Sequence, residues 1–435
     1  MENIAEIPAQ ACAMPRFEDG AANLQELIRR LAEDVANGIM DAEADQMCEA
    51  TGNSRNGHRT RTLKTCVGEL SLRVPKLRSG SFFPEDVITR YQRVDRALAA
   101  AVAEMYATGT STRKVQRVAE RMGVSRLSKD QASAIAADLD ADVSELVGRD
   151  MSGSGVPYVW LDATYAKCRR EGRAASTAVV TAIGCDEGGW RRVLGVSVVD
   201  TESYDSWLSF LRAVRARGVE GVRLVVSDAH PGLVRALGEV FQGAAWQRCV
   251  VHLMRDCMRE AGSRPLRARV GRILSPVFRG KDAGAVAAMY HVAVEMLESC
   301  CPKAARVLEE AEPDALAYLD FPASHWKRLR TNNLQERTNR EIKRRSRAVQ
   351  VFPSVASLER LAGAVMCEQD DLWADSRYFS EARMRELHEA KAPAASDARG
   401  GAELLEFTRG GAELLEFARR AIESSLELAD RVEAA

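Results

Sequence analysis

The stretch V-P-Y-V-W-L-D-A-T, residues 156–164, is an apolar run that closes on a carboxylate, Asp162. Short apolar runs bounded by turn residues are typical of buried β-strands. A second run, V-R-L-V-V-S-D-A-H at residues 222–230, has the same form and closes on Asp228. We therefore predict two buried strands, each with an aspartate at its carboxyl end.

Three more strands and two helices accompany these two strands in the sequence. Apolar runs at 178–184 and 192–199 flank a Glu-Gly-Gly turn, and Trp246 opens a fifth short strand. Residues 203–217 and 232–241 have helical apolar spacing. The order strand-strand-strand-helix-strand-helix-strand is that of the ribonuclease H-like fold, in which the first and fourth strands lie side by side. One aspartate at a strand end is most often a turn former, but this pair favours a shared ligand site.

The segment R-T-N-N-L-Q-E-R-T-N-R-E-I-K-R-R-S-R-A-V-Q-V-F-P-S, residues 330–354, predicts a helix. Leu334, Thr338 and Ile342 are spaced four apart, which gives the helix one face that can pack on a core. Asn333 is the expected cap, because its side chain can accept from the unpaired N–H groups of the first turn.

A second face of this helix carries charge. Glu336 is followed on that face by Arg340, Lys343 and Arg347, so one carboxylate heads a cationic surface suited to phosphate. The alternative is a capping box between Asn333 and Glu336 with a basic run that is simply solvated.

Composition and charge distribution narrow the class of protein. The 435 residues carry 61 Lys and Arg against 62 Asp and Glu, a net charge of −1, so local clusters matter more than the sum. Basic residues concentrate in 55–78, 113–129 and 327–347. The sequence has ten cysteines without regular spacing, no secretory leader and no long apolar run. We therefore predict a cytoplasmic protein that is associated with the bacterial nucleoid and not with a membrane. Cys249 and His252 form at most half of a zinc site, so zinc is not expected.

The amino-terminal part predicts two DNA-contacting units. Alternation through Val67, Leu70, Leu72 and Val74 around Gly68 indicates a strand pair. This strand pair, the first unit, either contacts DNA or is an arginine-rich surface loop. The second unit, at 109–138, is either a DNA-binding helix-turn-helix or a helical hairpin without a ligand. Arg113, Arg117 and Arg126 make the second unit basic, which favours DNA. The candidate contacts in the two units are Arg55, His58, Arg59, Arg61, Arg113, Lys114, Lys129 and Gln131.

These patterns predict an α/β protein: a ribonuclease H-like catalytic domain interrupted by an all-helical insertion and preceded by a mainly helical DNA-binding region. The expected division is a helical leader at 1–50, a DNA-binding region at 51–150, a catalytic domain at 151–256 plus 326–392, a helical insertion at 257–325 and an acidic helical tail at 393–435. In the tail, R-G-G-A-E-L-L-E-F recurs unchanged at 399–407 and 409–417. Two copies are too few for a solenoid and indicate a local duplication.

The three acids Asp162, Asp228 and Glu336 predict a hard oxygen site for Mg²⁺ or Mn²⁺. Two such ions activate a hydroxyl group and stabilise the leaving oxygen of an in-line displacement at a phosphodiester. The expected DNA contacts on the helix that carries Glu336 are Arg337, Arg340, Lys343, Arg344 and Arg347.

The sequence resembles the Mutator-type family of bacterial insertion-sequence transposases. The matching motifs are W-L-D-A-T-Y at Asp162, S-D-A-H-P-G-L at Asp228 followed by W-Q-R-C-x-x-H, and H-W-K-R-L-R-T-N-N-L-Q-E-R-T-N-R-E-I-K-R-R-S-R at Glu336. The resemblance extends from about Arg55 to Tyr378. It implies a DDE recombinase in which the three acids bind the catalytic metal and the amino-terminal part recognises terminal inverted repeats. The duplicated tail departs from the family pattern.

The resemblance leaves two main hypotheses. The first is a transposase that cleaves and joins double-stranded DNA, with inverted repeats and target DNA as partners, as a homodimer or larger assembly. The second is a catalytically silent DNA-binding regulator, and a nuclease without strand transfer is a weaker third. An intact set of three acids favours the first. Cys249, His252, Asn333 and Trp326 are expected to be structural or to lie near the site.

Overall fold

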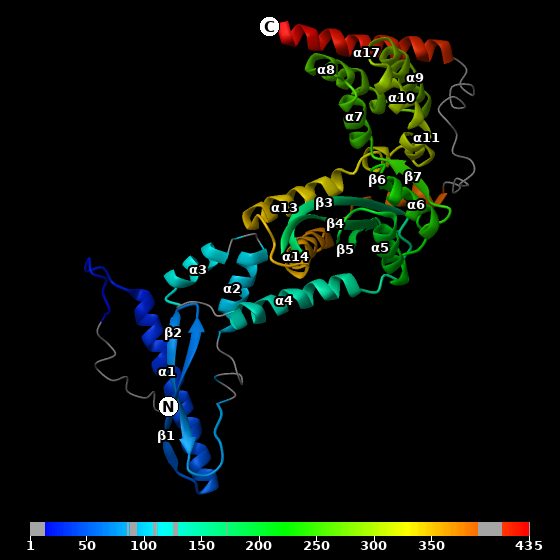
Figure 1. The fold of residues 1–435 in the computed structure, drawn as a ribbon. Helices are drawn as coiled ribbons and strands as arrows, with labels where there is room; N and C mark the ends of the chain where they lie inside the picture. Colours follow the sequence, from blue (N-terminus) through cyan, green and yellow to red (C-terminus); the bar gives the residue numbers. More distant parts are fainter. Residues whose placement is uncertain are drawn as a thin grey trace. The chain divides into compact units, whose positions relative to one another are not determined.

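The computed structural model describes residues 14–84, 87, 94–107, 110, 112–124, 129–170, 172–389 and 411–434. The chain forms two compact units, Met1–Ala141 and Asp142–Ala435. The first is mainly helical, and the second contains a mixed sheet (Figure 1).

The first unit is built around a hairpin and one long helix. Strands β1 (Arg55–Thr65) and β2 (Gly68–Leu77) pair antiparallel, which confirms the predicted strand pair, although Val67 lies in the turn. Helix α1 (Leu24–Thr51) lies along β2 (Figure 1). The buried apolar residues of this hairpin and helix are Met40, Ala44, Leu63, Leu70, Leu72 and Val74.

Three helices follow the hairpin. Helices α2 (Arg96–Ala107) and α3 (Thr112–Arg121) share a small apolar core, which includes Leu98 and Val115. Helix α4 (Lys129–Gly148) continues past residue 138, where the expected helix-turn-helix ends. Residues 139–147 contain neither Gly nor Pro, so no strong helix breaker stops the helix earlier. Residues 125–128 of the expected helix-turn-helix lie outside the described residues.

The second unit contains all five predicted strands. They are β3 (Tyr158–Arg170), β4 (Arg173–Cys185), β5 (Arg191–Val199), β6 (Leu224–Ser227) and β7 (Ala245–Arg248). Their order in the sheet is β5-β4-β3-β6-β7, with β3 antiparallel to β4 and β4 antiparallel to β5. Both β3–β6 and β6–β7 pairs are parallel. Strands β3 and β6 are therefore neighbours, as the sequence predicted.

Helices cover both faces of this sheet, which explains why its strands are apolar runs and not alternating ones. Helices α5 (Tyr204–Ala216) and α6 (Pro231–Val240) pack on the face that includes Val180. On the other face, α13 (Asn333–Val349) and α14 (Val355–Ala374) pack against residues that include Val179. Because Val179 and Val180 are adjacent in β4, their side chains point to opposite faces.

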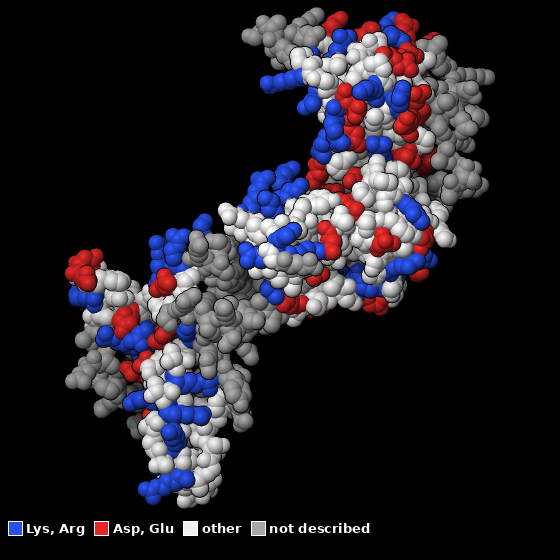
Figure 2. All heavy atoms as spheres, viewed as in Figure 1, with Lys and Arg blue, Asp and Glu red and all other residues white. Residues whose placement is uncertain are grey.

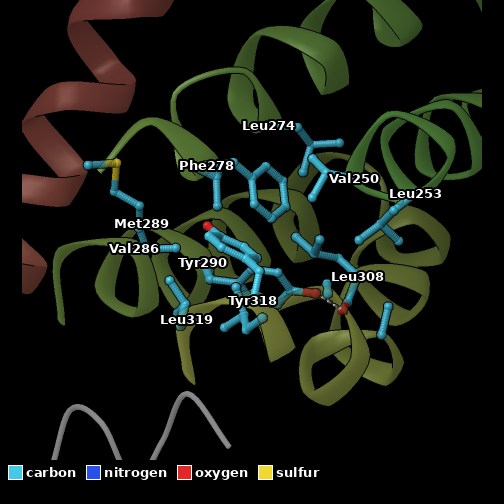
Figure 3. Close-up of a cluster of buried hydrophobic side chains, with 14 of the residues drawn as sticks. Val250, Leu253, Leu274, Phe278, Val286, Met289, Tyr290, Leu308, Tyr318 and Leu319 are labelled. Carbon is cyan, nitrogen blue, oxygen red and sulfur yellow. Dashed lines mark hydrogen bonds between the residues drawn. The ribbon is translucent and has the colours of Figure 1, made fainter. Parts of the chain in front are cut away.

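A helical region follows β7. It comprises α7 (Val250–Arg259), α8 (Arg264–Leu274), η2 (Val277–Arg279), α9 (Ala283–Cys300), α10 (Pro302–Glu310), α11 (Glu312–Ala315), η3 (Ala317–Asp320) and α12 (Trp326–Leu329). Figure 3 shows its core, where aromatic side chains such as Phe278 and Tyr290 pack among aliphatic ones. The Tyr290 hydroxyl donates to the Leu308 carbonyl, so this buried polar group is satisfied.

Two more helices of the second unit lie within the described residues. Helix α15 (Glu381–Glu389) adds Met384 and Leu387 to the helical core. Helix α17 (Gly411–Ala434) packs on α8 and α9 through residues that include Ala418 and Ile422 (Figure 1). The second copy of the duplicated sequence lies in part in α17, whereas the first copy lies outside the described residues.

Helix α13 is fixed to the sheet by buried amide groups. The Gln335 side chain is fully buried, its Nε2 donates to the Trp160 carbonyl at 2.8 Å, and its Oε1 accepts from the Thr181 hydroxyl at 2.9 Å. One side chain thus joins the helix to both β3 and β4. Around it, Thr338 and Ile342 are buried, which confirms the predicted core face of this helix.

We expect Gln335→Ala to lower the free energy of unfolding by about 3 kcal/mol, because it leaves a cavity and removes the partners of buried polar groups. Urea denaturation followed by circular dichroism measures the change. Arg337→Ala, at an exposed position two residues later, is the matched control and should change stability by less than about 0.5 kcal/mol. Equal stability of the two variants would show that the amide does not fix the helix.

Candidate active site

Asp162 and Asp228 lie level on neighbouring strands. Trp160 of β3 pairs with Val226 of β6, and continuing this parallel register by two residues sets Asp162 beside Asp228. Asp228 directly follows the last residue of β6, as predicted. Asp162 lies inside β3, which continues to Arg170 because it pairs with β4, so the prediction that Asp162 ends its strand is wrong. The sheet therefore brings together two carboxylates that are 66 residues apart in the sequence.

The environment of Asp162 disfavours its ionised form. Its side chain is only 8% exposed, and burial together with the charge of Asp228 raises the pKa of Asp162 to about 7. Two hydrogen bonds oppose this shift: Asn339 Nδ2 donates to Oδ2 at 2.8 Å, and the Ala163 N–H donates to Oδ1 at 3.1 Å. Like charges held in a dry site are a common cause of such a shift.

Glu336 lies in the first turn of α13, close to the same place. Its side chain is 30% exposed and approaches Arg255, with 3.6 Å between the guanidinium nitrogen and the carboxylate oxygen. His252 lies within the electrostatic influence of both Asp228 and Glu336, while burial lowers the pKa of its imidazole. Within the described ranges, however, no three His, Cys, Asp or Glu side chains are grouped closely enough to hold a metal ion.

The expected cap at Asn333 is wrong. The residue before the helix is Asn332, whose side chain makes no capping bond, and Asn333 is an exposed residue of the first turn. The Asn332 amide instead donates to the Leu161 carbonyl at 2.8 Å, so a contact to β3 replaces the local cap. This bond lies one residue from Asp162 and fixes the start of α13 beside it.

Two of the expected structural residues are buried. The Cys249 sulfur accepts from the Asn332 N–H at 3.2 Å, and burial raises the pKa of its thiol to about 11. Trp326 donates its indole N–H to the Phe321 carbonyl at 2.7 Å. Three residues of the site were not predicted from sequence: Asn339, Gln335 and Arg255. Asn339 had a signal, because it is three residues after Glu336 in the same helix.

The exposed face of α13 is basic. Figure 2 shows Lys and Arg side chains gathered over this helix, and the exposed ones are Arg337, Arg340, Lys343, Arg344 and Arg347. Arg344 is paired with Glu341 of the same helix at 2.5 Å. The neighbouring Arg345 is buried and bonded to Glu341, so it belongs to the core and not to this surface.

The amino-terminal candidates differ in their surroundings. Arg55 pairs with Asp41 and Asp45, and His58 Nε2 lies 3.0 Å from an Asp41 oxygen. Arg61 lies over the Phe83 ring. Arg59 and Lys114 are exposed, and the side chains of Arg113, Lys129 and Gln131 lie outside the described part. In the described part of the chain, no helix is long and apolar enough to cross a membrane.

The raised pKa of Asp162 predicts how stability depends on pH. Because this carboxyl has a higher pKa folded than unfolded, folding loses stability as pH rises from about 4 to 7, and the loss is complete above pH 7. The unfolding free energy of the native chain should fall between pH 4 and pH 8 in the presence of a chelator. In Asp162→Asn this fall should be smaller by roughly 2–4 kcal/mol. Urea titrations at both pH values measure this. The exposed Asp205→Asn is the control, and parallel pH profiles for Asp162→Asn and the native chain would contradict the assignment.

Comparison with known proteins identifies the family of this chain. The family model "Transposase, Mutator family" matches residues 9–376. The chain is 38% identical to the transposase for insertion sequence element IS1081 of Mycobacterium tuberculosis, over 81% of this chain and 87% of that protein. It is 35% identical to the transposase for IS406 of Burkholderia multivorans, over 86% and 97%. It is also 34% identical to the transposase for IS256 in transposon Tn4001 of Staphylococcus aureus, over 80% and 90%. The chain therefore belongs to the Mutator family of transposases.

Proposed function

We propose that this chain is a DDE transposase that binds the terminal inverted repeats of an insertion sequence and catalyses metal-dependent cleavage and strand transfer of DNA. The observation that carries the proposal is the pair Asp162 and Asp228, level on two parallel strands, where burial and the charge of Asp228 together raise the pKa of Asp162. Glu336 is the third acid. It lies on α13, which buried amides join to β3, the strand that carries Asp162.

The order of the strands and the arrangement of the helices also support this proposal. The sheet order β5-β4-β3-β6-β7, with helices on both faces, supports a ribonuclease H-like catalytic domain. Helices α3 and α4 support a helix-turn-helix within residues 109–138. The division proposed from sequence places DNA recognition at 51–150, catalysis at 151–256 plus 326–392, and a helical insertion at 257–325.

The donor set fits a divalent cation. Asp162, Asp228 and Glu336 would hold Mg²⁺ or Mn²⁺, because carboxylate oxygens are the ligands these hard ions prefer. A cation would also offset the charge of Asp228, which together with the larger effect of burial raises the pKa of Asp162. Among the described residues, the Glu336 carboxylate pairs with Arg255, and such a partly exposed pair contributes little free energy. When bound, two such ions polarise the phosphodiester and stabilise the oxygens that attack and leave.

The chain's own residues orient the site and the DNA. Asn339 holds one oxygen of Asp162 in place, and Asn332 fixes the helix start beside it. His252 is half-buried and lies within the electrostatic influence of Asp228 and Glu336. The exposed cations of α13 follow Glu336 along the helix and are positioned to bind the backbone of the DNA that is cut.

We expect Asp228→Asn to reduce cleavage of a duplex carrying the element's end by roughly three orders of magnitude, since several kcal/mol of charge stabilisation are lost. DNA binding in the same assay should be unchanged. Gel analysis of cleaved and joined products with Mg²⁺ or Mn²⁺ measures the effect, and imperfect inverted repeats flanking the coding region define the substrate. Asp205→Asn is the control. Cleavage by Asp228→Asn at the native rate would show that Asp228 is not a metal ligand in catalysis. A native chain that binds the repeats without cutting them would favour the silent regulator.

Replacing Lys343 and Arg347 together with Ala should weaken DNA binding and lower the slope of log K against log salt by about 2, because each lost phosphate contact removes about 0.9 from that slope. Fluorescence anisotropy at several salt concentrations measures the slope. Arg345→Lys is not a suitable control, because Arg345 is buried. The exposed Arg212→Ala, on α5, is the matched control. A slope equal to that of the native chain would show that the basic face of α13 is a solvated surface that does not contact DNA.

A further inference from the structure

Helix α1 exposes an apolar stripe that no described residue covers. Leu24, Ile28, Leu31, Val35 and Ile39 are between 36% and 59% exposed. The opposite side of the same helix, which includes Met40 and Ala44, is buried in the hairpin core. The helix thus has one apolar face in use and a second one free, and an exposed apolar stripe of this length marks an interaction site.

The spacing of the stripe is that of a coiled coil. Leu24, Ile28, Leu31, Val35, Gly38 and Ala42 follow one another at intervals of four, three, four, three and four residues, and all six are exposed. Alternating intervals of four and three place apolar residues along a seam that packs on a second helix. The seam runs roughly 27 Å at 1.5 Å per residue.

We propose that this stripe pairs with the same stripe of a second copy of the chain, in antiparallel orientation. The two smallest residues of the seam, Gly38 and Ala42, lie in its carboxyl-terminal half. An antiparallel pair centred near residue 33 sets Leu24 against Ala42, Ile28 against Gly38 and Leu31 against Val35 of the other copy. Leu24 and Ile28 then each meet a small residue, and the two-fold axis repeats every contact.

Charge supports the same orientation. In the antiparallel pair, Arg30 of one helix, which pairs with Glu26 of its own helix, comes near Asp34 of the other, and the two-fold axis repeats this contact. Both side chains are exposed. A parallel pair would set Gly38 against Gly38, leaving a hollow, and would place Asp34 beside the apolar Ile39 of the other helix. Size and charge therefore both favour the antiparallel arrangement.

The pairing is independent of the chemistry proposed above. It uses residues of the first unit only and requires neither DNA nor the three acids. It would supply two chains for the two ends of an element, but a chain without nuclease activity would pair equally well. Asp228→Asn, which removes the proposed catalysis, should therefore leave the pairing unchanged, so failure of one proposal is distinguishable from failure of the other.

The test is the mass of the full chain in solution, without DNA or divalent metal, by analytical ultracentrifugation at micromolar concentration. The native chain should have twice the mass of one chain, and Ile28→Lys combined with Val35→Lys should halve it while the circular dichroism spectrum stays unchanged. Ala50→Lys, exposed on the same helix beyond the stripe, is the matched control and should stay paired.

Orientation is tested by cysteine cross-linking. A mixture of Ile28→Cys and Gly38→Cys chains should form mixed disulfides more readily than either variant alone, with the unsubstituted chain reporting the background from its own cysteines. A native chain of single mass would show that the stripe is covered within one molecule and would overturn the proposal. A dimer that survives Ile28→Lys with Val35→Lys would place the interface elsewhere and overturn it as well.

Discussion

The attachment of α13 to the central strand is the constraint on which the site depends. Two buried amides, Asn332 and Gln335, donate to the carbonyls of Leu161 and Trp160, the two residues that precede Asp162. A buried amide left without partners costs more free energy than a typical hydrogen bond contributes, so the helix has one favourable position on the strand. That position carries Asn339 to Asp162, which lies within β3, and places Glu336 on the same helix.

The same geometry sets the electrostatics of the site. Register alone places Asp162 beside Asp228, and the packing of α13 removes Asp162 from water, so the folded chain holds an unfavourable carboxylate pair. Natural proteins retain such unfavourable arrangements mainly at functional sites. The two sides of α13 have different roles. The exposed side presents positive charge to a polyanion, whereas the buried side forms amide hydrogen bonds to the sheet.

Much of the second unit was predictable from sequence, because it depends on long apolar runs. The strands around Asp162 and Asp228 and the buried face of α13 at Ile342 follow from periodicity alone. The cap at Asn333 was wrong because a distant carbonyl, that of Leu161, competes successfully for the Asn332 amide, and local spacing contains no information about it. The pair of Glu336 with Arg255 depends on side-chain rotamers and could not be predicted.

Packing between segments far apart in the sequence was also beyond prediction. The duplicated tail had no assigned role, yet α17 packs on α8 and α9. The most direct test of the three-acid site is anomalous X-ray scattering from crystals of the chain with Mn²⁺ and a duplex carrying the element's end. We predict manganese bound by carboxylate oxygens of Asp162, Asp228 and Glu336, with Glu336 released from Arg255. Manganese bound elsewhere, or at the two aspartates with Glu336 still on Arg255, would contradict it.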